Sequence, residues 1–218
     1  MGKLILVRHG HTPLNNRGSQ ERLRGWLDVP LDQQGLQEAV ESAGKLASYP
    51  VRAVFSSDLK RARQTAETIC KATGADMVAT NELRPWNLGV FCGQLLGEII
   101  PFLDFLNKHP DTPAPNGESF HQFYERYSRR LHAVLKVAEE SEGYVVAVTH
   151  VRNLLAAKTI LNDGDRDCVP VKGGPSTGTL TFVENVNGAW RMRTDQSQTL
   201  TMIGTQQENE PGHVFIAS

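Results

Sequence analysis

The chain has 218 residues, of which 39% are hydrophobic and 22% are charged, values typical of a globular protein and of neither a disordered chain nor a membrane protein. A formal net charge of -1 argues against a nucleic-acid partner held by many phosphate contacts, so any anion site must be local. The three cysteines form no CxxC pair, which argues against a disulfide framework and a thiolate zinc site and favours a reducing, cytoplasmic location.

Short apolar runs alternate with helical patterns in the first third of the chain. The run that starts at Lys3 is too short for a helix or a membrane span, and it ends in a polar cluster. After Asp32, which is expected as an N-cap, apolar residues that include Leu36 and Val40 recur near the helical period. These patterns predict a strand over 3–7, a helix over 32–48, a strand over 53–55, and a helix over 59–73 that the Ser-Ser-Asp cluster 56–58 caps and Gly74 ends.

The middle of the chain is less regular. Residues 81–97 are rich in Pro, Trp and Gly, and 109–119 contains three prolines, so both segments are expected as loops around a short helix over 101–108. We expect the region 82–118 to form an insert over the functional site. Further elements are predicted as a helix over 119–140, a strand over 144–149, a helix over 153–161, and a hairpin of 179–184 with 189–193 around Asn187-Gly188.

Strands that alternate with helices predict an α/β fold. We expect a doubly wound, mostly parallel sheet with helices on both faces and a C-terminal β-hairpin. A single domain over 1–195 accounts for these elements, and the polar, Gln-rich residues 196–218 are expected to form a tail. In such a sheet, ligands bind beyond the carboxyl ends of the strands.

Charged or imidazole side chains follow three of the predicted strands. Arg8 and His9 come directly after the first strand, Arg61 lies one turn into the helix after the second, and His150 ends the strand over 144–149. Because the carboxyl ends of parallel strands meet at one edge of a sheet, we expect these four side chains to converge. A single histidine or arginine in such a place is often structural, so the prediction rests on the convergence.

The four residue types suit phosphoryl transfer. Arg8 and Arg61 can each grip a phosphoryl group through paired, charge-assisted hydrogen bonds. Neutral imidazole has an available lone pair near neutral pH, so His9 is the candidate nucleophile. His150 can hydrogen-bond the equatorial oxygens as their charge rearranges, and Asn15 can add a neutral donor for substrate binding.

Several motifs resemble those of the histidine phosphatase superfamily, also called the phosphoglycerate mutase-like family. The first is Leu6-Val7-Arg8-His9-Gly10-His11-Thr12, and Asn15 falls where that family keeps an asparagine. The others are Gly25-Trp26 with Asp28, Pro30-Leu31 and Gly35, the segment 56–66 around Arg61, Asn116-Gly117-Glu118-Ser119, and Val146 to His150. Their order and spacing fit the family from residue 3 to about residue 183.

This resemblance implies a phosphoglycerate mutase-like fold and a metal-independent histidine phosphatase without a cofactor. His9 would take the phosphoryl group from a phosphorylated small molecule, and water would then attack the phosphohistidine. Arg8, Arg61 and His150 would complete the catalytic pocket, so the domain 1–195 would be the catalytic one. We expect no nucleic-acid partner and no membrane partner, and a homodimer is one expectation for an oligomeric state that the sequence leaves open.

The chain departs from the family pattern where the proton donor is expected. The family usually has Leu-x-Glu with a downstream Gly, and aligning on Leu83 and Gly89 puts Pro85, which cannot donate a proton, at the position of the acid. General acid catalysis is worth about 10²–10⁴-fold in rate. Glu82 and His11 are weaker candidates for the donor, and a substrate with a good leaving group would need none.

Several functions stay open on the sequence. A phosphatase is favoured over a phosphoglycerate mutase, because residues 84–109 lack the paired arginines that resemblance to true mutases would require. A phosphate-binding module with weak turnover is the alternative that Pro85 prompts, and a protein phosphatase with a shallow pocket is a weaker one. Arg84 and Trp86 could contact the non-phosphate part of a substrate, and the Gly-rich run 172–178 is expected as a turn into the hairpin.

Overall fold

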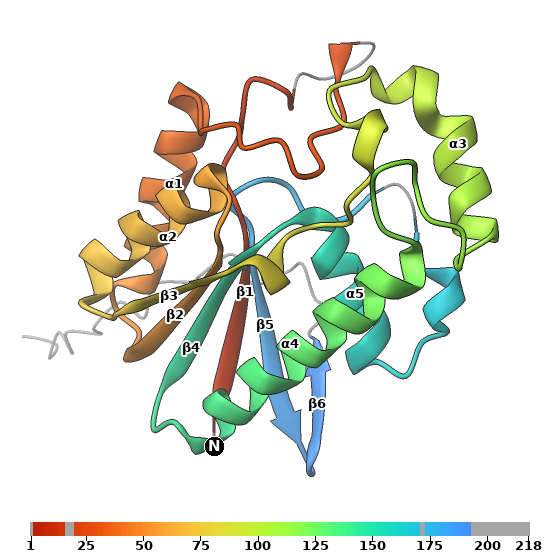
Figure 1. Ribbon diagram of the computed structural model, residues 1–218. Helices are drawn as coiled ribbons and strands as arrows, with labels where there is room; N and C mark the ends of the chain where they lie inside the picture. Colours follow the sequence, from red (N-terminus) through yellow and green to blue (C-terminus); the bar gives the residue numbers. More distant parts are fainter. Residues whose placement is uncertain (1, 16–19, 171–172, 193–218) are drawn as a thin grey trace, which may run out of the picture.

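The computed structural model describes residues 2–15, 20–170 and 173–192. Its centre is a six-stranded sheet in the order β3-β2-β4-β1-β5-β6 (Figure 1). The strands are β1 (Lys3–Arg8), β2 (Val51–Ser57), β3 (Met77–Thr80), β4 (Tyr144–Thr149), β5 (Leu180–Val186) and β6 (Ala189–Met192). The first four strands run parallel, β5 is antiparallel to β1, and β6 is antiparallel to β5. The predicted α/β fold and its C-terminal hairpin are confirmed.

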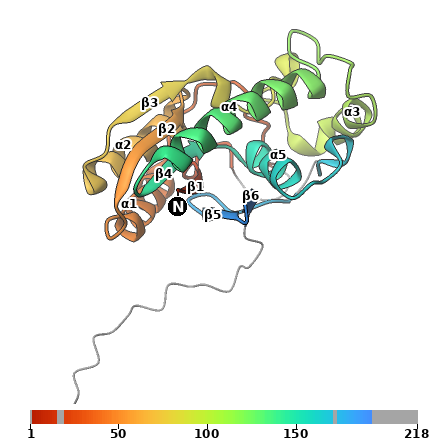
Figure 2. The same ribbon diagram turned by 90° about the horizontal axis from the view of Figure 1, so that it is seen from below.

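Helices cover both faces of the sheet, as Figures 1 and 2 show. The helices are α1 (Gln33–Leu46), α2 (Lys60–Thr73), α3 (Leu96–Lys108), α4 (Phe120–Glu140) and α5 (Val151–Leu161). Ile5 and Val7 of β1 pack with side chains of α1 and α2, whereas Leu4 and Leu6 pack with side chains of α4 and α5. Because successive side chains of a strand point to opposite faces, one apolar run supplies both cores.

The helix termini show which capping predictions were right. Asp32 caps α1 by accepting a hydrogen bond from the backbone N–H of Gly35, and Gly74 ends α2 in the left-handed conformation at φ 74°. The predicted Ser-Ser-Asp cap of α2 is wrong, because Leu59 is the N-cap and makes no side-chain cap hydrogen bond. The side chain of Asp28, from a distant loop, instead accepts a 2.7 Å hydrogen bond from the N–H of Lys60.

The apolar stripe predicted for the first helix is partly wrong. Leu36 and Val40 are 42% and 57% exposed, whereas Ala39 and Leu46 are fully buried. Apart from Leu46, the face of α1 that packs inward is built from small side chains, including the buried Ser42, because α1 lies close to α2 and the sheet. The hydrophobic periodicity therefore predicted where the helix lies in the sequence, but not which of its faces is buried.

The region between β2 and α4 holds most of the structure that the sequence did not predict. The short edge strand β3 was missed, because its four residues are half-buried or exposed and form no apolar run. Two short 3-10 helices, η2 (Asn81–Leu83) and η3 (Gly89–Phe91), break the expected loop. Helix α3 begins five residues before the predicted start and contains Pro101. It stands at the opposite end of the molecule from α1 and α2 (Figure 2).

The C-terminal hairpin turns at the predicted Asn187-Gly188 pair. Both residues have positive φ, at 54° and 86°, which is the conformation that a two-residue hairpin loop requires. The predicted tail over 196–218 lies outside the described residues. Within the part of the chain that the structure describes, no helix has the length and apolar character to cross a membrane.

Candidate active site

A cavity of about 450 Å³ opens beyond the carboxyl ends of β1, β2 and β4. The topology predicts this position, because ligands in open α/β sheets bind outside the carboxyl ends of the strands. All four predicted catalytic residues line the cavity. At one end it is cationic and imidazole-rich, with Arg8, His9, Arg24, Arg61 and His150. The other end is apolar, with Leu88, Leu96, Ile100, Leu103, Val151 and Leu155.

His9 is held so that one ring nitrogen remains available. The backbone N–H of His9 donates to the carbonyl of Thr149 at 3.0 Å, which ties it to the end of β4. Its Nδ1 lies 2.7 Å from the carbonyl oxygen of Gly10, and because a carbonyl only accepts, Nδ1 carries the proton. The lone pair is then on Nε2. Burial, and next the charges of Arg61 and Arg8, lower the pKa of His9 well below its usual range, so the imidazole is neutral at neutral pH.

The loop after β1 is packed tightly against two helices, which fixes the position of His9. The N–H of Gly10 donates to Thr65 Oγ1 of α2 at 3.1 Å. A Cβ atom on Gly10 would lie 2.4 Å from the carbonyl oxygen of Gly35 in α1, and one on Gly35 would lie 2.0 Å from the carbonyl oxygen of His11. Glycine is required at both positions because the backbones approach each other too closely for a side chain.

Arg8 and Arg61 are oriented by backbone carbonyls. Arg61 is 1% exposed and donates to the carbonyls of Leu27 and Gly25 at 2.7 and 2.8 Å. Arg8 donates to the carbonyl of Pro175 at 2.6 Å. Burial and the nearby Arg24 lower the pKa of Arg8 to about 10 and that of Arg61 to about 9. Both guanidiniums are therefore charged at neutral pH, and neither has a carboxylate hydrogen-bond partner among the described residues.

The ring of His150 lies next to that of His9, with centroids 5.0 Å apart and the ring planes tilted by 59°. It follows β4 directly and is the N-cap residue of α5. Both ring nitrogens are buried and lack a hydrogen-bond partner among the described residues. Burial, then Arg61 and His9, lower the pKa of His150 well below its usual range. Since buried polar atoms are nearly always paired, this neutral ring is placed to hydrogen-bond a bound ligand.

Three further charged residues that line the cavity, Glu21, Arg24 and Arg152, were not predicted from the sequence. Arg24 donates to the carbonyl of Leu14 at 3.0 Å, and both of its terminal nitrogens lie 3.4 Å from Glu21 Oε1. Glu21 and Arg24 come from a loop without secondary-structure signal, so the sequence offered only their position directly before the Gly25-Trp26 motif. Arg152 also lines the cavity, but its terminal nitrogens donate to the carbonyls of Val169 and Pro170 and to Asn107.

Asn15 does not line the cavity. It is 9% exposed, and its Oδ1 accepts hydrogen bonds from the N–H and the hydroxyl of Thr12 at 3.0 and 2.7 Å. These contacts shape the loop that follows the nucleophile candidate. A direct role of Asn15 in substrate binding stays a prediction.

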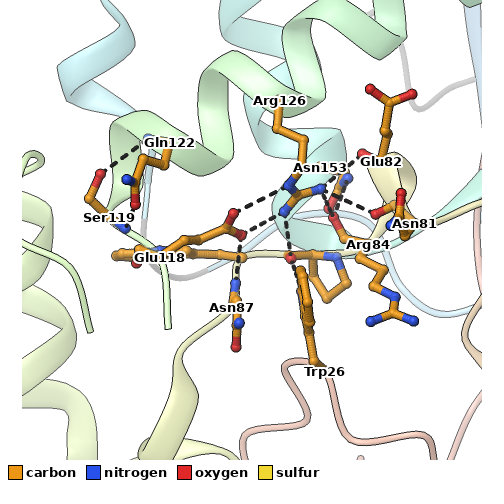
Figure 3. Close-up of polar contacts among 12 residues, drawn as sticks. Trp26, Asn81, Glu82, Arg84, Asn87, Glu118, Ser119, Gln122, Arg126 and Asn153 are labelled. Carbon is orange, nitrogen blue, oxygen red and sulfur yellow. Dashed lines mark hydrogen bonds and ion pairs between the residues drawn. The ribbon is translucent and has the colours of Figure 1, made fainter. Parts of the chain in front are cut away.

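The loop that carries Pro85 is clamped by Arg126 of α4, as Figure 3 shows. The guanidinium donates to Glu118 Oε1 at 2.6 Å and to the carbonyls of Glu82, Arg84 and Pro85 at 2.9 to 3.2 Å. The other partners of this clamp are the N–H of Asn87, which donates to Glu118 Oε1 at 2.9 Å, and Trp26, whose Nε1 donates to the carbonyl of Pro85 at 2.8 Å. The Asn-Gly-Glu-Ser motif therefore holds this loop in place through its glutamate.

Neither of the two acids considered from the sequence, Glu82 and His11, lines the cavity. Glu82 turns outward, where its carboxylate oxygens lie 3.6 Å from Arg129 and 3.8 Å from Arg130, and it does not line the cavity. His11 also lies outside the cavity lining, with its Nδ1 2.6 Å from Asp32 Oδ2. Pro85 itself does line the cavity. Neither of the two residues considered from the sequence is thus placed to protonate a leaving group.

Among the other residues singled out from the sequence, some line the cavity and others make structural contacts only. Arg84 forms a bidentate pair with Asp58 at 2.7 Å, stacks over Trp26, and does not line the cavity. Trp86 lines the cavity but is 3% exposed, and its Nε1 donates to the carbonyl of Glu118. The Gly-rich run is more than a turn, because Gly173 and Gly174 line the cavity; residues 171–172 lie outside the described residues.

Comparisons with known proteins agree with this geometry. The family model described as histidine phosphatase superfamily (branch 1) matches residues 4–194. A probable phosphoglycerate mutase of Escherichia fergusonii is 31% identical over 152 residues, which cover 67% of this chain and 69% of that protein. Mycobacterial glucosyl-3-phosphoglycerate phosphatase complexed with VO3 is 27% identical with a TM-score of 0.73, over 88% of this chain and 97% of that one. YhfR of Bacillus stearothermophilus is 27% identical with a TM-score of 0.72, over 87% of this chain and 94% of that one.

Proposed function

The chain belongs to the histidine phosphatase superfamily, and on that premise we propose that it is a phosphatase that hydrolyses a phosphomonoester through a phosphohistidine on His9. The observation that carries the proposal is the protonation of His9, whose Nδ1 is bound to the Gly10 carbonyl and whose Nε2 holds the lone pair. A nucleophile in this form needs no separate base to attack phosphorus.

The remaining residues of the cationic end fit the charge that develops during transfer. A phosphoryl group in transit spreads its charge over three equatorial oxygens, so catalysis rests on positioning and electrostatic stabilisation. Arg8 and Arg61 are fixed before any substrate arrives, which lowers the cost of reorganisation. His150 would donate to the same oxygens. Water would then attack the phosphohistidine and release inorganic phosphate.

The apolar end of the cavity favours hydrolysis over a mutase reaction. A phosphoglycerate mutase must bind the substrate carboxylate as well as the phosphate, which calls for cations away from His9. Two other arginines are unsuited to this task, since Arg84 lies outside the cavity lining and is paired with Asp58, and Arg152 lines the cavity but is held by carbonyls and Asn107. The mutase is the second candidate, because a curated relative carries that name.

A chromogenic ester tests the phosphatase. We expect the protein to release 4-nitrophenol and phosphate from 4-nitrophenyl phosphate, and His9→Ala to abolish this activity. His132→Ala is the matched control, because that imidazole lies on the exposed face of α4 and contacts Ser128. Equal background rates in wild type and His9→Ala would refute the proposal. Rapid conversion of 3-phosphoglycerate to its 2-isomer with a trace of bisphosphate primer would replace it by the mutase.

Two further proposals accompany this function. We propose metal-independent catalysis without a cofactor, since every step above uses side chains of the chain and water. Within the described residues there is no group of three or more His, Cys, Asp or Glu side chains that could hold a metal ion. A cytoplasmic location is proposed from the cysteines, of which Cys70 and Cys92 are free thiols.

A further inference from the structure

Breaking the bond to an alkoxide leaving group requires a proton, and the cavity contains few groups that can supply one. Pro85 has no proton to give, and Glu82 and His11 lie outside the cavity lining. His9 is the nucleophile candidate, and burial keeps His150 neutral, so that it is a poor acid. The arginines of the lining stay protonated throughout. Among the described residues that line the cavity, Glu21 is the only one with a carboxyl group.

We propose that Glu21 is the general acid that protonates the leaving oxygen, a role that rests on the phosphatase proposed above. In-line transfer places the leaving oxygen on the side of phosphorus opposite to His9 Nε2. Glu21 lines the same cavity as His9 and has neighbours of both kinds, cationic and apolar, in that lining. Its carboxylate is beside Arg24 of the cationic end, and its backbone carbonyl accepts a 2.7 Å hydrogen bond from Leu96 of the apolar end.

The backbone around Glu21 is fixed even though it belongs to a loop. Arg22 forms an isolated antiparallel bridge with Leu95, and the N–H of Leu23 donates to the carbonyl of Gln94 at 3.0 Å. The side chain of Arg22 donates to the carbonyl of Gly93 at 2.8 Å. These contacts tie the segment to the start of α3, so the Glu21 side chain is carried on a supported backbone.

The carboxylate of Glu21 is held more loosely than its backbone. Among the described residues, the Glu21 side chain hydrogen-bonds Arg24 alone, at 3.4 Å from both terminal nitrogens, whereas Arg24 has a shorter anchor at the Leu14 carbonyl. The Glu21 side chain is 32% exposed. A phosphoryl dianion bound at Arg24 would compete for that guanidinium and place negative charge beside Glu21. Like charge favours the protonated, neutral form of a carboxyl group, which is the form that an acid needs.

The proposed cycle is balanced in atoms and electrons. The Nε2 lone pair of His9 forms the N–P bond while the P–O bond to the leaving group breaks, and the Glu21 proton passes to the leaving oxygen to give an alcohol. The Glu21 carboxylate then takes a proton from water as the water oxygen attacks phosphorus. The N–P bond breaks with its electron pair returning to His9, phosphate leaves, and Glu21 is protonated again.

Two esters of similar size test this role by their leaving groups. Benzyl phosphate releases an alkoxide that needs a proton, whereas 4-nitrophenyl phosphate releases a stable phenolate that does not. In Glu21→Gln we expect kcat/KM to fall by about 10²–10⁴-fold for benzyl phosphate and by less than about 10-fold for 4-nitrophenyl phosphate. The matched control is Glu82→Gln, which removes a carboxylate outside the cavity lining and should leave both values within about 2-fold of wild type.

The ratio of the two kcat/KM values is the readout. A change in folded fraction or phosphate affinity affects both esters alike, and kcat/KM reports the steps up to phosphorylation of His9. An equal loss for both esters in Glu21→Gln, or no loss for either, would overturn the acid role while leaving the phosphatase in place. If wild type hydrolyses neither ester faster than His9→Ala, the proposed function fails and the role of Glu21 fails with it.

Discussion

Replacing Arg61 by methionine should abolish phosphate binding while changing the free energy of unfolding only slightly. Arg61 is 1% exposed and donates to the carbonyls of Gly25 and Leu27. Burial, and next Arg24, lower its pKa from the usual range of an arginine to about 9. A folded-state pKa below the unfolded value means that the folded state disfavours the charged form, and at pH 7 that penalty is fully present. The difference corresponds to roughly 5 kcal/mol.

Arg61→Met removes this penalty and adds others. Methionine fills much of the same space without charge. The carbonyls of Gly25 and Leu27 lose their donors, which costs about 1–3 kcal/mol each. Together the two lost hydrogen bonds cost about 2–6 kcal/mol, which nearly offsets the gain of roughly 5 kcal/mol. We therefore expect the free energy of unfolding to change by between a fall of about 1 kcal/mol and a rise of about 3 kcal/mol. Phosphate binding should be lost.

Urea unfolding with and without inorganic phosphate measures both quantities. Phosphate at 100 times its Kd should stabilise wild type by about 2.7 kcal/mol and leave Arg61→Met unchanged. Arg126→Met is the control with the opposite expectation, because it leaves the half-buried Glu118 carboxylate without its arginine at a place outside the cavity lining. It should lose about 2–4 kcal/mol of stability and keep the phosphate effect. A loss well above about 1 kcal/mol in phosphate-free Arg61→Met, or an undiminished phosphate effect in it, would contradict this reasoning.

Two other predictions concern packing and pH. Gly10→Ala should lower the free energy of unfolding by about 1–3 kcal/mol and reduce the rate of hydrolysis at least about tenfold, because the new Cβ meets the Gly35 carbonyl. Gly44→Ala is the control, since a Cβ there has open space around it, and its stability should be unchanged or higher. Equal stability of the two variants would contradict this prediction. Hydrogen bonds to Asp167 and Asp111 raise the pKa of His121. These ion pairs should therefore add about 1 kcal/mol to the free energy of unfolding below pH 6.5, and this contribution should be lost as the pH rises through the raised pKa of the folded state. Urea unfolding of wild type and His121→Gln at pH 5.5 and pH 9 should show the larger difference at pH 5.5, and the reverse order would exclude this pairing.

The convergence of the predicted catalytic residues could be read from the sequence because it depends on topology. Arg8, His9 and His150 directly follow apolar runs, and parallel strands bring such positions to one edge whatever the loops do. The orientation of His9 was not readable in the same way. It depends on a contact with the Gly10 carbonyl and on the close approach of Gly10 to Gly35, neither of which leaves a periodic pattern.

Each feature that the sequence did not predict has a physical cause. Glu21 and Arg24 are placed by hydrogen bonds between two loops, at Leu14 and at the start of α3, and such pairing has no local sequence signature. The edge strand β3 was missed because its four residues are all partly exposed and therefore form no apolar run in the sequence. Asp28 caps α2 across 32 positions of sequence, whereas the expected cap was sought next to the helix.

The cationic end of the cavity is oriented by neutral groups. The partners of Arg61, Arg8 and Arg24 include the carbonyls of Gly25, Leu27, Pro175 and Leu14, which fix direction without cancelling charge. Carboxylates in those places would raise the stability of each arginine and remove its attraction for a dianion. The structure thus keeps a destabilising cluster of positive charge that a bound phosphoryl group would relieve. Glu21 is the one carboxylate that lines this cavity among the described residues, and its weak 3.4 Å contacts with Arg24 are of a kind that a bound phosphoryl group can replace.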